Sequence, residues 1–180
     1  MPPGTTLFSF DIDLSDVDRG VYAPLNLRVA QHPSELPDHL VTRVLAYCLE
    51  HTEGIEFTKG LSEPDEPALW VRDLTGQLQT WIDVGLPSPE RLHRAAKAAP
   101  RVAVYIHKEP TRWMKDVLDA RIHRAAKLEA FAFDRDWLAA LTAKLDRRNQ
   151  WSLARSDGQI YLTVGDDTLE TVLERPLEKP

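Results

Sequence analysis

The segment RVAVYIH, Arg101–His107, constrains the fold of this chain more than any other feature. Its consecutive apolar side chains point alternately to the two faces of a strand, so both faces have to be covered. Helical patterns flank the segment, over Pro89–Ala99 on one side and Arg112–Arg124 on the other. A buried strand between two helices is typical of α/β proteins.

Two β-hairpins are predicted, one near each end of the sequence. Apolar and polar residues alternate over Phe8–Leu14 and Val21–Val29, with the turn Asp18-Arg19-Gly20 between them. Near the C-terminus, Asp157-Gly158 separates the strand patterns Trp151–Ala154 and Ile160–Val164. Period-two alternation around a turn of this composition predicts an antiparallel pair of strands.

A helix is predicted after the first hairpin. Ser34 is a suitable N-cap, and Glu35 would follow it in the first turn, where the helix dipole favours an acid. One buried stripe recurs at spacings of three and four, namely Leu36, Leu40, Val41, Val44, Leu45 and Cys48. Gly54 lies beyond the end of this stripe, where a left-handed residue is favoured.

The centre of the sequence predicts a meander of short strands over Ile55–Lys59, Ala68–Arg72 and Leu78–Val84. After the buried strand, Leu128–Phe133 predicts a further strand, and Asp134 a helix cap. The fold class is therefore α/β, with one mixed sheet flanked by helices and with a hairpin at each end of the chain.

Length and composition favour one domain over residues 1–175 and a frayed tail over residues 176–180. The single Cys48 excludes an internal disulfide and a cysteine-based zinc site. No apolar run reaches the ~18 residues of a membrane helix, and no secretory signal is recognisable at the start. We therefore expect a cytoplasmic protein that has no membrane partner.

Charge is distributed unevenly along the chain, whose net charge is −6. Up to Pro89 there are 5 basic and 14 acidic residues, whereas Glu90–Lys127 has 10 basic and 4 acidic residues. Two interpretations stay open. The segment Arg91–Lys127 is a surface that follows nucleic-acid phosphates, beside an acidic metal site, or it is simply the solvated face of two helices.

Five stretches of the sequence, taken together and in this order, resemble the YaeQ family of bacterial proteins. They are HPSE (His32–Glu35), EFTKGLS (Glu56–Ser62), DEPALW (Asp65–Trp70), WIDVG (Trp81–Gly85) and VAVY (Val102–Tyr105). The family is similar in fold to the PD-(D/E)xK restriction-endonuclease-like superfamily. The resemblance therefore implies a restriction-endonuclease-like core, to which the two hairpins are additions.

The resemblance also implies an acidic site. Glu35 matches the helix-borne glutamate of such nucleases, Asp65 matches the aspartate of the Pro-Asp motif with Glu66 as its neighbour, and Asp83 matches the acid that ends the third core strand. The lysine expected two residues after that acid is absent, because the position is Gly85. Lys59, on a strand next to the acidic loop, is the best substitute.

Phosphodiester hydrolysis at such a site would use Mg²⁺ or Mn²⁺ held by Asp65, Glu66 and Asp83, with Lys59 assisting the attacking water. Strand alternation predicts that Gln79, Trp81 and Asp83 face the cleft. Phosphate loops, nucleophile elbows and zinc helices are absent from the sequence, which removes those enzyme classes.

Two functions therefore stay open. The first is a magnesium-dependent nuclease that uses the catalytic set Glu35, Lys59, Asp65, Glu66 and Asp83. The second is a non-enzymatic binding or regulatory protein with nucleic acid or the transcription machinery as its partner. It would keep a nuclease fold that no longer catalyses hydrolysis. The missing lysine and the net charge of −6 favour the second function, and the acidic residues favour the first.

Overall fold

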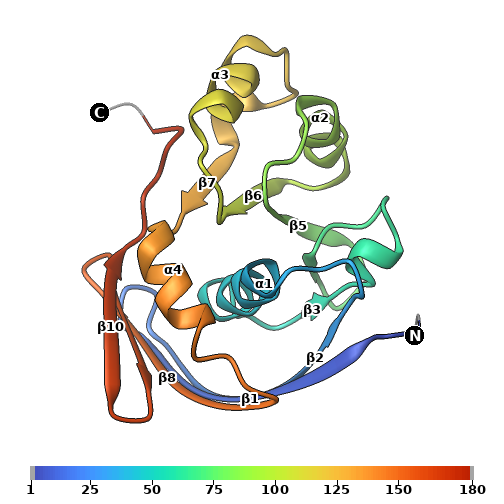
Figure 1. The fold of residues 1–180 in the computed structure, drawn as a ribbon. Coiled ribbons are helices and arrows are strands. Elements are labelled where there is room, and N and C mark those ends of the chain that lie inside the picture. The colour runs from blue at the N-terminus through green and yellow to red at the C-terminus, as the bar shows by residue number, and fades with distance from the viewer. Residues whose placement is uncertain (1–2, 179–180) are drawn as a thin grey trace. The chain divides into compact units, whose positions relative to one another are not determined.

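The computed structural model describes residues 3–178, which form four α-helices and two five-stranded β-sheets (Figure 1). The described residues divide into two compact units. The first unit takes in residues 3–41 and 133–173, and the second takes in residues 42–132 and 174–178. The predicted α/β class with mixed strand directions is confirmed, but the single predicted sheet is wrong, because there are two.

The sheet of the first unit has the strand order β10-β9-β8-β1-β2. Its strands are β1 (Thr6–Asp16), β2 (Val21–Gln31), β8 (Arg148–Ser156), β9 (Gln159–Val164) and β10 (Asp167–Val172). Both predicted hairpins are present, as β1–β2 and β8–β9. Parallel pairing of β1 with β8 joins them, so the two ends of the chain build one sheet rather than two separate additions.

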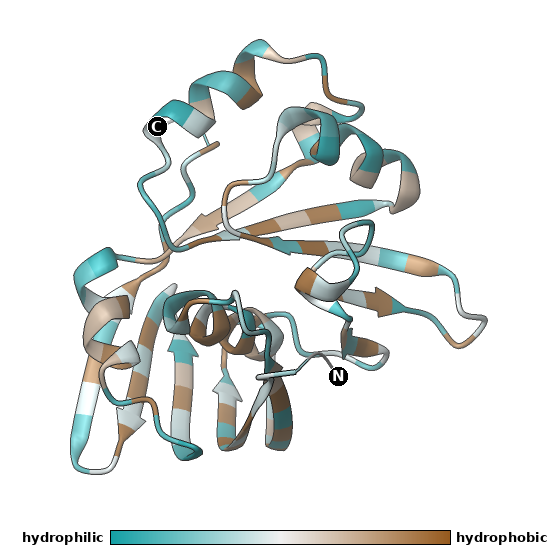
Figure 2. Ribbon diagram, turned by 45° about the vertical axis from the view of Figure 1, so that its right-hand side comes forward, coloured by the Kyte–Doolittle hydropathy of each residue, from teal (hydrophilic) through white to brown (hydrophobic). Residues whose placement is uncertain are grey.

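Alternation along these strands gives the sheet one apolar face. Phe10, Ile12 and Leu14 of β1 are buried, and so are Trp151 and Leu153 of the parallel strand β8. Alternating brown and teal bands mark this pattern along the strands (Figure 2). The helix α4 (Arg135–Thr142) lies against β10. It begins at the predicted cap, where the Asp134 side chain accepts a hydrogen bond of 2.8 Å from the Trp137 amide.

The helix α1 (Pro37–Leu49) begins later than predicted, and the chain passes from the first unit to the second within it. Ser34 is therefore not its N-cap, and Leu36, predicted to be buried, is 64% exposed. The reason is Pro37, which suits a first helical turn but disfavours helical backbone in the residue before it. The rest of the predicted stripe is confirmed, because Leu40, Val41, Val44, Leu45 and Cys48 are fully buried.

The sheet of the second unit has the order β3-β4-β5-β6-β7. An antiparallel meander of β3 (Ile55–Phe57), β4 (Leu69–Arg72) and β5 (Leu78–Val84) continues into β6 (Arg101–Ile106) and β7 (Glu129–Ala132), which run parallel to β5. Gly54, at φ +88°, has the predicted left-handed backbone but leads into β3 rather than capping α1.

One face of this sheet packs against α2 (Pro89–Ala98) and α3 (Thr111–Asp119). This core contains Leu92 and Ala95 from α2, Trp113 and Val117 from α3, and Val102, Val104 and Ile106 from β6. The prediction that β6 is covered on both faces is confirmed, since every residue from Val102 to Ile106 is buried. The predicted helix Arg112–Arg124 is too long, because the chain turns after Asp119 and enters a short 3₁₀ turn, η2 (Ala125–Lys127).

Across residues 3–178 we find no helix that is both long and apolar enough to cross a membrane. The sequence predicts a single domain over residues 1–175. Whether the two units fold together as one domain stays a prediction. Of the predicted tail, residues 179–180 lie outside the described residues, and an ion pair joins Arg175 to Glu178 in the part before them.

Candidate functional site

The best-defined part of the predicted site is a buried ion pair between Asp83 and Arg91. Asp83 lies on β5 opposite Val104 of β6 and is 4% exposed. The Arg91 guanidinium donates to both carboxylate oxygens, from Nε to Oδ2 at 2.9 Å and from Nη2 to Oδ1 at 3.0 Å. This two-pronged geometry is the strongest way in which an arginine binds a carboxylate.

The start of α2 places Arg91 where it can reach β5. Ser88 caps the helix and accepts a hydrogen bond of 3.2 Å from the Arg91 amide, and Pro89 occupies the first helical position as predicted. Because the cap fixes the backbone of the first turn, the Arg91 side chain leaves the helix at its N-terminal end, beside the strand that α2 packs against.

Arg91 also holds the loop that carries the Pro-Asp motif. Its guanidinium donates to the carbonyl oxygen of Pro64 at 2.5 Å and to that of Glu66 at 2.8 Å. We call Arg91, Asp83, Pro64 and Glu66 the Arg91 cluster. In this cluster one cation connects β5, the acidic loop and the start of α2, and sequence reasoning missed it because Arg91 was assigned to the basic surface.

Asp65 and Glu66 have surroundings that differ from those of Asp83. Asp65 is exposed, and the Glu66 carboxylate accepts a hydrogen bond of 3.1 Å from the backbone amide of Lys59. Lys59 itself is exposed and contributes that amide just before the 3₁₀ turn η1 (Gly60–Ser62). Its predicted role toward water therefore stays a prediction.

Glu35 belongs to the first unit, whereas the other four predicted residues belong to the second. It is 6% exposed and precedes α1 rather than lying within its first turn. Its carboxylate pairs with the imidazole Nδ1 of His39, and its carbonyl oxygen accepts a hydrogen bond of 2.9 Å from Gln31. Glu35 therefore has a structural partner close in sequence.

These side chains do not fit a Mg²⁺ or Mn²⁺ ion. Among residues 3–178 no three histidine, cysteine, aspartate or glutamate side chains are placed so that they could hold a metal together. Both oxygens of Asp83 already bind a permanent cation, which would repel a divalent ion at the same carboxylate.

The backbone explains why no lysine stands at position 85. Gly85 has φ +106°, a conformation that costs about 1–3 kcal/mol for residues other than glycine. Its amide donates a hydrogen bond of 2.9 Å to the Tyr105 carbonyl, which ties this conformation to β6. A lysine here would strain the backbone at the end of β5.

The predicted open face of β5 is wrong for two of its three residues. Trp81 is 9% exposed and belongs to the core under α2, and Asp83 is buried beside it. Only Gln79 keeps partial exposure, and its side chain donates to Asp73 at 3.0 Å. The expected cleft face is therefore closed by the helix that follows the strand.

A second ion network lies on β6. It pairs Arg101, another cation of the basic segment, with acidic residues. The Arg101 guanidinium donates to Glu50 at 2.6 and 3.0 Å and also pairs with Glu129, and the Tyr105 hydroxyl donates to Glu50 at 2.7 Å. Burial alone would lower the pKa of Arg101, but the hydrogen bonds and charge of Glu50, followed by those of Glu129, outweigh it and raise this pKa. Arg101 is thus a permanent internal counterion.

The remaining cations of the basic segment face solvent. Arg91 and Arg101 are committed to acids inside the second unit, and the other eight basic residues of Glu90–Lys127 are exposed. These eight are Arg94, Lys97, Lys108, Arg112, Lys115, Arg121, Arg124 and Lys127.

Comparison with known proteins gives consistent matches over almost the whole chain. The family model described as "YaeQ protein" matches residues 1–173. The uncharacterized protein YaeQ of Escherichia coli K12 is 29% identical over 171 residues, 93% of each chain. The crystal structure of YaeQ from Pseudomonas syringae matches with a TM-score of 0.89 at 30% identity, over 97% of each chain. YaeQ from Xanthomonas axonopodis pv. citri matches at 0.88 and 32%, over 95% of this chain and 97% of that one.

Proposed function

The chain belongs to the YaeQ family, and from this premise we propose that it is a non-catalytic protein that binds nucleic acid. In this proposal its second unit is a restriction-endonuclease-like core that has lost turnover. The exposed cations of Glu90–Lys127 follow the phosphates, and the acidic residues serve the fold.

The Arg91 cluster carries the non-catalytic part of the proposal. A nuclease of this type needs a carboxylate that binds a divalent ion, yet Asp83 binds an arginine through both oxygens. The same arginine binds the carbonyl groups of Pro64 and Glu66, so a cation of the protein itself lies between Asp83 and the loop of the Pro-Asp motif. Gly85, where lysine is expected, adds independent support.

Topology supports the proposed core. A meander of three antiparallel strands, then a helix and a parallel strand, is the arrangement that the resemblance to restriction-endonuclease-like proteins implies. The charge distribution supports nucleic acid as the ligand, since eight cations of Glu90–Lys127 are exposed and the other two, Arg91 and Arg101, are paired with acids. Phosphate contacts of this kind give affinity that falls with added salt.

The test of the proposal is a binding and cleavage assay with single- and double-stranded DNA and RNA, in Mg²⁺, in Mn²⁺ and in EDTA. We expect binding that weakens with salt, intact substrates, and no rise of the melting temperature with either metal. The variants Arg94→Glu and Lys115→Glu should weaken binding, and the matched variants Arg135→Glu and Arg148→Glu, at exposed arginines of the first unit, should not.

Two outcomes would overturn the proposal. Metal-dependent cleavage that disappears in Asp83→Asn would establish the alternative function, a magnesium-dependent nuclease, and would require Arg91 to release Asp83 when the substrate binds. Absence of binding to every nucleic acid at low salt would remove the ligand and leave a protein partner as the remaining alternative.

A further inference from the structure

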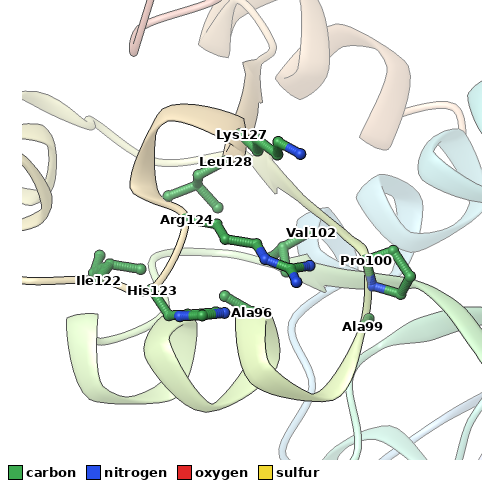
Figure 3. Close-up of a pocket in the computed structure, with 9 residues that line it drawn as sticks. All are labelled: Ala96, Ala99, Pro100, Val102, Ile122, His123, Arg124, Lys127 and Leu128. Atoms are coloured by element: carbon green, nitrogen blue, oxygen red, sulfur yellow. The ribbon is translucent and has the colours of Figure 1, made fainter.

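The second unit contains an open pocket where the end of α2, the start of β6 and the turn before β7 meet (Figure 3). It has a volume of about 250 Å³, including solvent at its mouth. Much of this volume is open solvent, so the pocket is a shallow hollow that contacts one ring or a short apolar group of a larger ligand and does not enclose it.

The walls of the pocket combine an apolar floor with a basic rim. Ala96, Ala99, Val102 and Ile122 are buried and form the floor. His123, Arg124 and Lys127 are exposed and form the rim, and no acidic residue lines the pocket. We call this feature the basic pocket. Its charge complements an anion that is attached to a flat apolar group.

The rim is positioned by the backbone. The His123 amide donates a hydrogen bond of 2.9 Å to Nδ1 of His93 on α2, and the two imidazole rings meet edge to face at 6.4 Å between centroids. Arg124 follows in a left-handed conformation, φ 52°, and the Lys127 amide donates to its carbonyl at 2.8 Å. This strained turn directs the Arg124 side chain across the mouth toward Val102 (Figure 3).

We propose that the basic pocket holds one base of a single-stranded nucleic acid, with Arg124 and Lys127 on the flanking phosphates. The inference rests on the proposed function and deepens it, because it names the form of nucleic acid and the point of contact. A base brings a flat ring and nearby phosphates in one ligand, and the floor, the imidazole of His123 and the two cations match those parts. An acidic peptide would match the rim alone.

The experiment measures binding of fluorescein-labelled oligo-dT and oligo-rU to the full chain. Arg124→Gln/Lys127→Gln should weaken binding by ~10-fold and reduce the salt slope by about 1.4, because each lost phosphate contact on a single strand contributes ~0.7. The pocket-filling variant Ala96→Leu should weaken binding to the normal strand but not to a strand with abasic sites. The normal-to-abasic affinity ratio of the wild-type chain gives the same information if that variant does not fold.

The outcomes separate the pocket from the proposed function. If the double variant binds as tightly as the wild-type chain while Arg94→Glu and Lys115→Glu bind weakly, the pocket inference is overturned and the proposed function stands. Equal affinity for normal and abasic strands, or displacement of both by poly-glutamate, would also overturn the pocket inference, because the protein would then recognise only the negative charge of the ligand. Loss of binding that is confined to oligo-dT or to oligo-rU would support the inference, and oligo-dU, which shares its base with oligo-rU, would then separate an effect of the sugar from one of the 5-methyl group.

Discussion

The Arg91 cluster and the basic pocket lie in the same unit and are both built around arginine, but they use its charge in opposite ways. The Arg91 guanidinium makes four hydrogen bonds inside the protein, two of them to the carboxylate of Asp83. Arg124 lies on a pocket rim that has no acid, with its side chain exposed. An arginine that is satisfied internally holds the fold together, whereas one that faces solvent beside an apolar floor remains available to an anionic ligand.

The largest expected effect follows from removing the cation of the Arg91 cluster. Arg91→Gln leaves Asp83 buried without its counterion, and breaking such a pair costs about 3 kcal/mol of unfolding free energy. We take the low end of the usual range because the Arg91 side chain is 24% exposed. Chemical denaturation measures the loss, and Arg94→Gln, an exposed position on the same helix, should change stability by less than ~0.5 kcal/mol.

A double-mutant cycle tests whether the two groups act as one unit. Asp83→Asn removes the buried charge, so Arg91→Gln/Asp83→Asn should be more stable than the sum of the two single losses predicts. Additive losses would mean that Arg91 stabilises the loop through Pro64 and Glu66 and not through Asp83. That result would weaken the contrast with the basic pocket.

The second prediction concerns the position where a nuclease lysine is expected. Gly85→Lys should lower the unfolding free energy by about 1–3 kcal/mol and should create no cleavage activity. A Cβ at this position would meet only His107 Nε2, at 3.9 Å, so the loss comes from φ +106° and not from a clash. Gly85→Ala should therefore lose as much as Gly85→Lys. A larger loss in the lysine variant would instead indicate repulsion between its amine and Arg91.

Much of the fold could be predicted from the sequence because local patterns determine it. The alternation of Phe10, Ile12 and Leu14 predicted β1. The capping residues Ser88 and Asp134 predicted the starts of α2 and α4. The apolar run of β6 predicted that both faces of this strand are covered. The strand β10 was missed because five of its six residues lack burial, which leaves no apolar pattern to detect. Pairing of β1 with β8 was also missed, since no local pattern specifies which distant strands meet.

The contacts that the acidic residues make could not be predicted from the sequence, for a physical reason. The sequence identifies acidic residues and their strand positions, but it does not show which cation will neutralise them. Arg91 follows Asp83 closely in the sequence, but it is the capped turn at Ser88 that brings the Arg91 guanidinium back to β5. The interpretation that placed Arg91 on a phosphate surface and Asp83 in a cleft therefore did not anticipate the ion pair between them.

The third prediction tests whether strain at the basic pocket is retained for binding. Arg124 and Asp157 are the two residues other than glycine with positive φ among residues 3–178, at 52° and 51°. Arg124→Gly should relieve strain and, after the entropy cost of glycine, stabilise the chain by about 0.5 kcal/mol while it weakens oligonucleotide binding. Asp157→Gly should leave both unchanged, since aspartate tolerates this conformation better. Equal stabilisation by the two variants would remove the argument that Arg124 is exceptional.

The smallest expected effect concerns Asp73, a carboxylate of the same β4–β5 hairpin as Asp83 that is satisfied by neutral donors. The Thr75 hydroxyl at 2.6 Å, followed by the Gln77 amide at 3.0 Å, lowers the pKa of Asp73 below its ordinary value. A lowered folded-state pKa means that the ionised form stabilises the fold above the pKa of ~3.9 of an unfolded aspartate. This stabilisation is lost as the pH falls through the lowered value.

Thermal melting between pH 7 and pH 3 measures this contribution as the difference between the wild-type chain and Asp73→Asn. The difference should be small, because the turn is exposed, and it should shrink toward zero at the acidic end. Thr75→Val removes the largest cause of the lowered pKa and should move the loss to higher pH. A difference that is zero at every pH would mean that the amide replaces the carboxylate fully, so that the hairpin needs a hydrogen-bond acceptor at position 73 and no charge. Asp83 would then be the one carboxylate of the hairpin whose charge itself stabilises the fold.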